Sequence, residues 1–316
     1  MYTVSSDDVM IAGGGAVGLA TALALLESGR NVRVIEARHV GAGSSHGNCG
    51  TITPSHAAPL AQPGMVQTAL RMMLQPDAPL YIKPRVDPVL WRWLLTFAAR
   101  CNVRDFEASA RAKGALLNDS RVRLTEWVHK YALECEFVES GEDYVFRDPR
   151  RLEHDMLEAP ILRELGVQVD VYEGRDYEAR EPALKPGVAG AIRFAGDAAL
   201  RPDKYVAELA RTLRALGGEI VEGCAFEGIE HERDGMRVRT SGGTFNARDL
   251  VCALGAWTPQ LADAIGLRAL RNAMQPGKGY SITYDPPALV PKHPLVLRER
   301  QAVSYTHLTL PTILLV

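Results

Sequence analysis

The sequence has little of what marks several protein classes. Its five cysteines form no Cys-x-x-Cys pair and no metal-finger spacing, so we expect neither a disulfide framework nor a metal site. No run of about 18 uncharged apolar residues occurs, and residues 1–8 lack a basic stretch followed by an apolar one, so we expect neither a membrane span nor a signal peptide. The net charge is only −2, from 36 basic and 38 acidic residues, which argues against a nucleic-acid partner. No His-Glu-x-x-His helix is present, so zinc-hydrolase chemistry has no support.

The composition is that of a globular protein that acts on a small molecule. Hydrophobic residues make up 47% and charged residues 23% of 316 positions. At about 150 residues per domain, this length predicts two domains. The unpaired cysteines favour a reducing compartment, so we expect a cytoplasmic protein, and peripheral contact with the inner face of the cell membrane stays open.

The first fifty residues carry the most specific pattern. An apolar stretch at 9–12 predicts a strand, Gly13, Gly15 and Gly18 follow in Gly-x-Gly-x-x-Gly spacing, and residues 19–28 predict a helix. In a strand–turn–helix unit the first glycine permits the tight turn. The second lets a pyrophosphate approach the backbone, and the third lets helix and strand pack closely. We therefore predict a dinucleotide site at the start of this helix, where the amides and the helix dipole favour phosphate.

A second predicted strand at 31–35 ends in an acidic residue. Glu36 is placed to accept hydrogen bonds from an adenosine ribose and would repel a 2′-phosphate, so NADP is disfavoured. FAD and NAD both satisfy these residues.

The segments that follow resemble a known family. Residues 41–50 (GAGSSHGNCG) are similar to the segment after the ribose-binding acid in FAD-dependent oxidoreductases of the D-amino-acid oxidase superfamily. Residues 51–60 (TITPSHAAPL) resemble its bacterial D-amino-acid dehydrogenase and D-hydroxyproline dehydrogenase branch. The resemblance implies an α/β fold, in which a Rossmann-like FAD-binding domain is joined to an α+β substrate domain built on an antiparallel sheet.

The resemblance also implies the cofactor and its contacts. A histidine that attaches FAD covalently would fall at Gly47 rather than at His46, so we expect non-covalent FAD. Small hydroxyl residues and the Asn of this loop would lie along the pyrophosphate and the flavin ring, and later segments at Phe226 and 253–255 would pass beside the dinucleotide. The predicted cofactor site comprises Gly13, Gly15, Ala16, Val17, Gly18, Glu36, Ala37, Arg38, Ser44, Ser45, Asn48, Gly50, Thr51, Phe226, Ala253 and Gly255.

The remaining sequence predicts how the domains divide the chain. We assign residues 1–61 and 196–262 to the FAD-binding domain and residues 62–195 and 263–303 to the substrate domain. Residues 90–98 predict a buried helix, although two tryptophans and an arginine would also suit a membrane interface.

Several further elements follow from local patterns. An amphipathic helix is expected over 108–130, and another over 153–165, ended by Gly166. A helix with Asp203 as N-cap reaches Leu216, and paired strands surround an Asp-Gly turn at 234–235.

The resemblance stops before the chain does. Residues 304–316 have no family counterpart and contain no acid, Lys or Arg, so we expect a non-native tail. The family continues for roughly a further quarter of its length, including an arginine that grips the substrate carboxylate. We therefore expect this chain to be an inactive or poorly folded fragment.

For the parent protein the expected reaction is oxidation of a D-amino acid or a cyclic D-imino acid, such as D-proline or D-hydroxyproline, by hydride transfer to flavin. His56 is the candidate for removing the amine proton, and Tyr280 for binding the substrate carboxylate. The sequence leaves open whether the electron acceptor is a quinone. The alternatives are an NAD-dependent dehydrogenase and a non-catalytic dinucleotide-binding protein.

Overall fold

The larger of two main sheets joins the start of the chain to a segment 200 residues later. The structure is a computed structural model that describes residues 7–74, 82–83, 85–283, 288–299, 302–304 and 309–315. The strand order is β8-β2-β1-β11-β10-β9. Four strands run parallel: β1 (Asp7–Ala12), β2 (Val32–Ile35), β8 (Glu219–Val221) and β11 (Gly243–Cys252). They are extended by the antiparallel β9 (Phe226–Glu232) and β10 (Gly235–Thr240).

This sheet is covered on both faces. Val9 and Ile11 of β1 pack with α1 (Ala16–Glu27) and α8 (Pro202–Ala215), whereas Met10 packs on the other face with Phe226 and Phe245. Side chains alternate between the two faces of a strand, so a strand that is apolar at every position is buried on both sides. This explains why residues 9–12 of β1 are all apolar.

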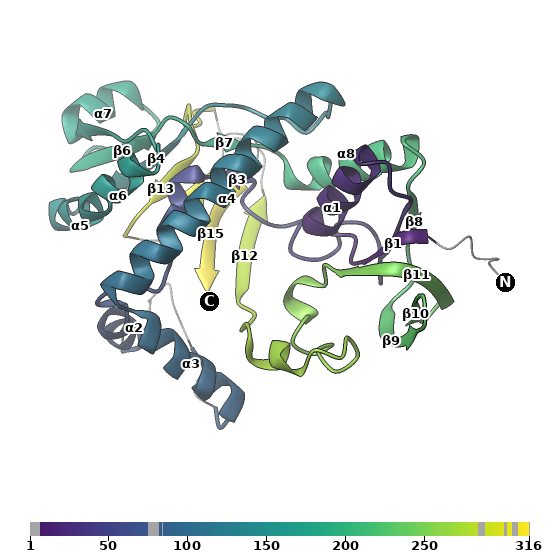
Figure 1. The fold of residues 1–316 in the computed structure, drawn as a ribbon. Coiled ribbons are helices and arrows are strands. Elements are labelled where there is room, and N and C mark those ends of the chain that lie inside the picture. The colour runs from purple at the N-terminus through teal and green to yellow at the C-terminus, as the bar shows by residue number, and fades with distance from the viewer. Residues whose placement is uncertain are drawn as a thin grey trace.

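The smaller sheet has the strand order β14-β13-β4-β6-β5. Its strands are β4 (Glu142–Phe146), β5 (Asp170–Glu173), β6 (Gly190–Phe194), β13 (Leu295–Leu297) and β14 (Ala302–Ser304). The short helices α5 (Pro149–Asp155), η2 (Met156–Glu158), α6 (Ala159–Glu164) and α7 (Gly174–Arg180) lie around this sheet (Figure 1). All pairs are antiparallel except β4 with β13, as expected for a substrate domain built on an antiparallel sheet.

Two small strand pairs and several helices complete the described chain. β3 (Thr51–Ile52) pairs with β7 (Ala198–Ala199), and β12 (Lys278–Thr283) pairs with β15 (Thr309–Leu315). Apart from one long helix described next, the remaining helices are η1 (Pro54–Ala57), α2 (Met65–Met73), α3 (Pro88–Arg100), η3 (Gly255–Trp257) and η4 (Arg268–Asn272). That residues 304–316 are a non-native tail stays a prediction. The pairing of β15 with β12 does not show where this segment comes from.

One long helix connects the surroundings of the two sheets. This helix is α4 (Val103–Lys130). Near its C-terminal end, Trp127 is buried in the core formed by α1 and α8, and its indole nitrogen donates to Glu27 Oε2 at 3.0 Å. Toward its N-terminus, Gly114 lies against Leu165 and Ala57, which belong to the core of the smaller sheet. The helix predicted over 108–130 is thus confirmed and is longer than expected.

Other elements confirm or correct the predictions. The βαβ unit, the hairpin around 234–235 and the helix after Arg201 are confirmed. The single helix over 153–165 is wrong: the segment forms α5, η2 and α6, because Pro160 has no N–H to continue a helix through it. Asp203 is not the N-cap of α8: Arg201 holds that position with Pro202 next, and Asp203 instead pairs with Arg201 at 2.6 Å.

The predicted burial of residues 90–98 is also wrong. They form α3 as expected, and Asp87 caps it by accepting from the amides of Val89 and Leu90. Only Leu90 is buried, however, while Trp91 and Leu95 are 54% and 71% exposed. The helix lies next to α2 at the edge of the molecule, and Trp93, Leu94 and Phe97 are only partly buried there (Figure 1).

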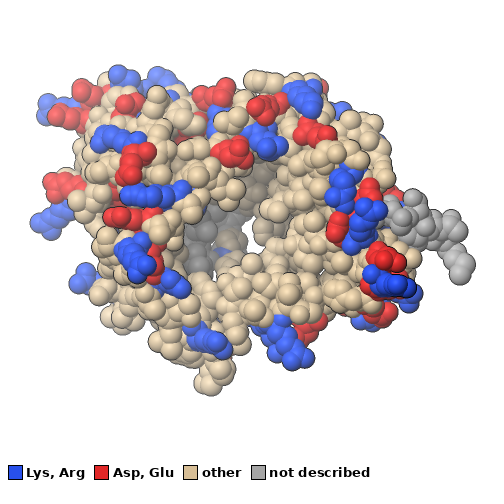
Figure 2. All heavy atoms as spheres, viewed as in Figure 1, with Lys and Arg blue, Asp and Glu red and all other residues tan. Residues whose placement is uncertain are grey.

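The surface agrees with a near-neutral protein. Figure 2 shows acidic and basic side chains interspersed, with a deep hollow in the middle of the visible face. Within the described ranges, no helix is both long and apolar enough to cross a membrane. The two sheets draw their strands from the segments assigned to the two domains, and the domain boundaries themselves stay a prediction.

Candidate functional site

A pocket of about 780 Å³ opens at the carboxyl ends of the parallel strands, in the range of about 300–1,000 Å³ typical of small-molecule sites. Ligands of open α/β sheets bind at this edge. The structure brings twelve of the sixteen predicted cofactor residues to its wall: Gly13, Gly15, Ala16, Val17, Glu36, Ala37, Arg38, Ser44, Ser45, Phe226, Ala253 and Gly255.

The glycine turn between β1 and α1 leaves no room for side chains. Gly13 has a φ of +116°, and a Cβ there would lie 2.3 Å from the carbonyl oxygen of Ala253. A Cβ on Gly18 would lie 1.9 Å from the carbonyl oxygen of Gly13, so Gly18 packs the helix against the turn rather than lining the pocket. Gly15 faces the pocket, where a Cβ would meet the Ser45 hydroxyl at 3.1 Å.

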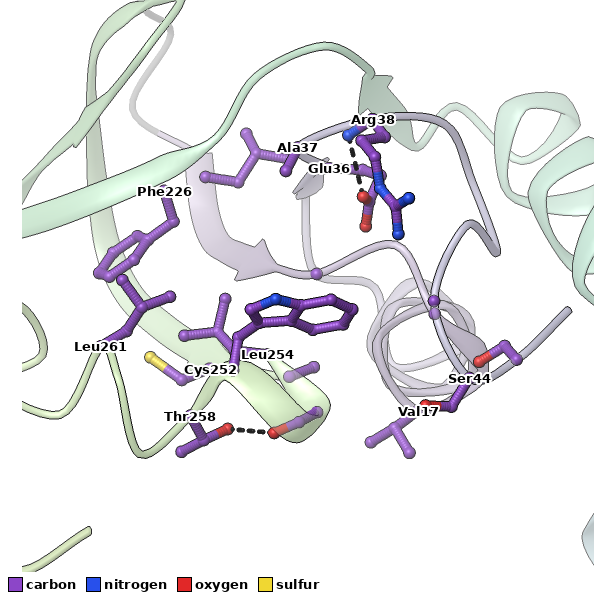
Figure 3. Close-up of a pocket in the computed structure, with 18 of the residues that line it drawn as sticks. Val17, Glu36, Ala37, Arg38, Ser44, Phe226, Cys252, Leu254, Thr258 and Leu261 are labelled. Atoms are coloured by element: carbon purple, nitrogen blue, oxygen red, sulfur yellow. Dashed lines mark hydrogen bonds between the residues drawn. The ribbon is translucent and has the colours of Figure 1, made fainter. Parts of the chain in front are cut away.

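Glu36 is held in place at the end of β2 by backbone amides. Its Oε2 accepts from the amide of Gly14 at 2.8 Å, and its Oε1 from the amide of Arg38 at 3.0 Å. The Arg38 guanidinium donates to the carbonyl of Ala42 at 2.7 Å. Glu36 and Arg38 lie together on one side of the pocket, with Val17 and Ser44 at the start of α1 and its facing loop (Figure 3). A carboxylate fixed in this way keeps lone pairs for ribose hydroxyls.

The loop over residues 41–50 closes the helix end of the pocket. Ser45 Oγ accepts from the amide of Ala16 at 2.9 Å and so caps α1 from a distant part of the chain. Asn48 does not line the pocket. It supports the loop instead, because its side chain donates to the carbonyl of Ser44 at 3.1 Å and accepts from the amide of Gly50 at 2.8 Å.

The other two predicted residues outside the pocket connect the loop to the next strand. Gly50 has a φ of +65°, and a Cβ there would lie 2.1 Å from the carbonyl oxygen of Leu200. Thr51 pairs with Ala199 in the β3–β7 ladder. Both residues carry the chain away from the pocket toward η1.

The opposite wall contains residues that the sequence reasoning missed. Cys252 lines the pocket, and burial raises the pKa of its thiol. Trp257 of η3 is half-exposed and contacts the pocket next to Gly43. Figure 3 shows Phe226 and Leu261 side by side at the far end. The other lining residues outside the prediction are Ile35, Gly43, Ala225, Thr258 and Met274, and Leu254 belongs to the predicted segment 253–255. Trp257, two residues after the glycine that follows β11, was the signal for this wall.

These features fit a dinucleotide. The bare glycine backbone and the positive end of α1 suit a pyrophosphate, Glu36 suits a ribose, and the apolar wall around Phe226 suits a purine. Within the described residues, no group of three or more His, Cys, Asp or Glu side chains is arranged to hold a metal ion.

Of the two predicted catalytic residues, His56 is not among the residues that line this pocket. His56 is in η1, where its Nδ1 lies 3.0 Å from Thr53 Oγ1 and its Nε2 hydrogen-bonds the hydroxyl of Tyr144. Tyr280 belongs to β12, and its side chain lies outside the described residues. The roles of His56 in removing the amine proton and of Tyr280 in binding the substrate carboxylate therefore stay predictions.

The comparison with protein families matches nearly the whole chain to one family. The model of the DAO family, described as FAD dependent oxidoreductase, matches residues 8–310. The D-amino acid dehydrogenase of Granulibacter bethesdensis is 30% identical over 280 residues, which are 87% of this chain and 66% of that protein. The chain therefore spans slightly less than two thirds of the length of this curated relative.

Solved structures share the fold. Glycine oxidase from Geobacillus kaustophilus superposes with a TM-score of 0.65 at 19% identity, covering 97% of this chain and 70% of that one. L-proline dehydrogenase from P. horikoshii superposes with a TM-score of 0.67 at 17% identity, covering 98% and 70%. At these identities the likeness supports the architecture and not the substrate.

Proposed function

Because this chain belongs to the DAO family of FAD-dependent oxidoreductases, we propose that it oxidises D-amino acids or cyclic D-imino acids to imines. The family uses FAD, so the NAD-dependent alternative is set aside. The observation that carries the proposal is the pocket at the start of α1, which joins the glycine turn, Glu36 and the loop over 41–50.

In this proposal each part of the pocket binds one part of FAD. The amides at the start of α1 and the hydroxyl of Ser44 bind the pyrophosphate, Glu36 binds the adenosine ribose, and the wall around Phe226 and Leu261 encloses the adenine. Asn48 fixes the loop through both of its hydrogen bonds. FAD, when bound, supplies the acceptor for the hydride that leaves the substrate Cα. We propose that FAD is held non-covalently.

The substrate class rests on the relatives. The curated relatives are named D-amino acid dehydrogenase, and proteins of the same fold include an L-proline dehydrogenase and a glycine oxidase. All three names describe oxidation next to an amine. Cyclic D-imino acids such as D-proline and D-hydroxyproline are our narrower proposal. The name dehydrogenase favours an acceptor other than oxygen, and we propose a quinone.

A peripheral contact with the membrane forms part of this proposal. The neighbouring helices α2 and α3 expose Leu70, Trp91 and Leu95 beside Arg71 and Arg92. Apolar and aromatic side chains flanked by arginines suit the interface of an anionic bilayer. Flotation with anionic vesicles tests this contact: binding that is lost on Trp91→Ala supports it, and absence of binding contradicts it.

The function is tested by anaerobic reduction of the bound flavin. We expect D-proline or D-alanine to bleach the absorbance of the FAD-loaded protein, and the L-enantiomers to leave it unchanged. A protein that binds FAD but is reduced by no amino or imino acid would be a non-catalytic binding protein, and the proposal would be wrong.

A further inference from the structure

The loop over residues 41–50 is fixed at both ends. Its first and last residues, Gly41 and Gly50, are buried and have positive φ values of +74° and +65°. Gly41 packs on α8, and a Cβ on Gly50 would lie 2.1 Å from the carbonyl oxygen of Leu200. Several residues between these ends are exposed. Glycine adopts positive φ without strain, so the two ends are suited to act as hinges for the segment between them.

Two contacts hold the middle of this loop against the cofactor pocket. Ser45 Oγ accepts from the amide of Ala16 at 2.9 Å. Gly43 lies against the indole of Trp257, since a Cβ on Gly43 would be 3.3 Å from Cζ3 of that ring. Trp257 belongs to η3 on the opposite wall, so the loop and the ring join the two walls. The two hydrogen bonds of the Asn48 side chain lie within the loop, so its second half can move as one unit.

A second cavity, of about 200 Å³, lies behind the loop, between it and α8. We call it the back cavity. The loop contributes Gly41, Ser45 and His46 to its wall, and α8 contributes Ala207 and Ala210 among others. Ser45 lines both the back cavity and the cofactor pocket, so it forms the partition between them. Side chains normally fill such spaces, and this one leaves the loop room to move back.

The shape of FAD makes movement of the loop necessary. FAD has two wide aromatic ends, the adenine and the flavin ring, and a narrow pyrophosphate between them. In the proposed binding mode the adenine lies beside Phe226, and the pyrophosphate lies beside Ser44 and the start of α1. A molecule of this shape enters from the side more easily than by threading a wide end past the closed contact between Gly43 and Trp257. Withdrawal of the loop opens that side.

We propose that residues 42–49 form a flap that swings from the cofactor pocket into the back cavity to admit FAD and then closes over the pyrophosphate. Gly41 and Gly50 are its hinges, and the hydrogen bond from the Ala16 amide to Ser45 is its latch. The flap controls how fast FAD enters and leaves. It does not set the equilibrium affinity, because the loop is closed both before and after binding. The proposal rests on the assignment of the pocket to FAD.

The first test needs no cofactor. The Ala16 amide exchanges its hydrogen with water only when Ser45 leaves it, so hydrogen exchange followed by NMR reports how often the flap opens. Ala207→Phe or Ala210→Leu, which fill the back cavity from α8, should slow this exchange about 10-fold or more, because overpacking disfavours the open flap by at least this order. Ala215→Phe is the matched control, because Ala215 is exposed at the end of α8 and does not line the back cavity, so exchange should stay unchanged.

The two filling variants enter the back cavity from different sides. Ala207 is exposed, so the fold tolerates phenylalanine there. Ala210 is buried, so leucine at this position cannot turn toward solvent. Circular dichroism and urea unfolding show which variants are folded. Exchange at Ala16 that is equal in wild type and in the folded filling variants would overturn the flap.

The second test measures FAD binding to the full chain by stopped-flow fluorescence. If the flap must open first, the observed rate levels off at high FAD concentration, at the rate of opening. Ala207→Phe should lower this limiting rate and the dissociation rate of FAD by the same factor of about 10, so Kd should change by less than about 2-fold. Ser45→Ala removes the latch and should raise the limiting rate about 5-fold, and Ser45→Thr should restore it.

The outcomes separate the flap from the cofactor assignment. Equal changes in the association and dissociation rates support the flap. A lower affinity with an unchanged limiting rate would mean that Ser45 acts only on bound FAD or that filling distorts the pocket, and the flap would be wrong. A protein that binds no FAD would refute the assignment of the pocket, while exchange at Ala16 would still decide whether the loop opens.

Discussion

Replacing Glu142 by glutamine should change how protein stability depends on pH. Its pKa of about 8 in the folded protein stands against an ordinary value of 4.5, because the carboxyl is buried beside Asp197 and Asp143. The folded state therefore binds this proton more tightly than the unfolded chain, by at most about 5 kcal/mol at ~1.4 kcal/mol per pH unit. This stabilisation is complete below about pH 4.5 and is lost progressively as the pH rises to about 8.

Glutamine stays neutral at every pH, so Glu142→Gln lacks this loss. Relative to wild type, the free energy of unfolding of the variant should rise by several kcal/mol between pH 4.5 and pH 8. Urea unfolding followed by circular dichroism at four or five pH values measures it.

Glu139→Gln is the control for the loss of one carboxylate. Its side chain is 57% exposed in an ion pair with Arg121, and its difference from wild type should stay within about 1 kcal/mol at all pH values. A difference between Glu142→Gln and wild type that does not vary with pH would refute the reasoning, because it would mean that Glu142 is ionised at its ordinary pKa.

Three further predictions concern the cofactor pocket and the surface. Glu36→Gln should weaken FAD binding about 10-fold or more, because a charged acceptor for ribose is worth about 1.5–3 kcal/mol; fluorescence titration with FAD measures it, and an unchanged affinity would contradict the role of Glu36. Gly18→Ala should lower the free energy of unfolding by about 1–3 kcal/mol, because its Cβ would lie 1.9 Å from the Gly13 carbonyl oxygen; urea unfolding with normal stability would show that the turn is placed wrongly. Trp91→Ala should change stability by less than about 0.5 kcal/mol, since the ring is exposed, whereas a loss of about 3–5 kcal/mol in the same assay would show that the ring is buried.

The βαβ unit could be predicted because its signals are local. The apolar run of β1, the spacing of Gly13, Gly15 and Gly18, and the acid at position 36 each report a short-range requirement of backbone geometry or charge. The same holds for the turn at 234–235. Such features need no knowledge of what packs on them.

Other features depend on distant contacts and could not be predicted. The exposure of Trp91 depends on whether a core lies beside α3, which its own apolar composition does not reveal. Leu261 reaches the pocket only because β11 lies next to β1. Glu142 stands in a strand without any motif, and only the fold brings its carboxyl to His56.

The cofactor pocket is tested most directly by the absorbance of the purified chain. Flavin bands near roughly 375 and 450 nm, with FAD released on denaturation in about equimolar amount, are the predicted result. A folded chain that remains colourless when incubated with excess FAD, while the pocket over Gly13 and Glu36 is intact, would contradict the assignment of this pocket to FAD.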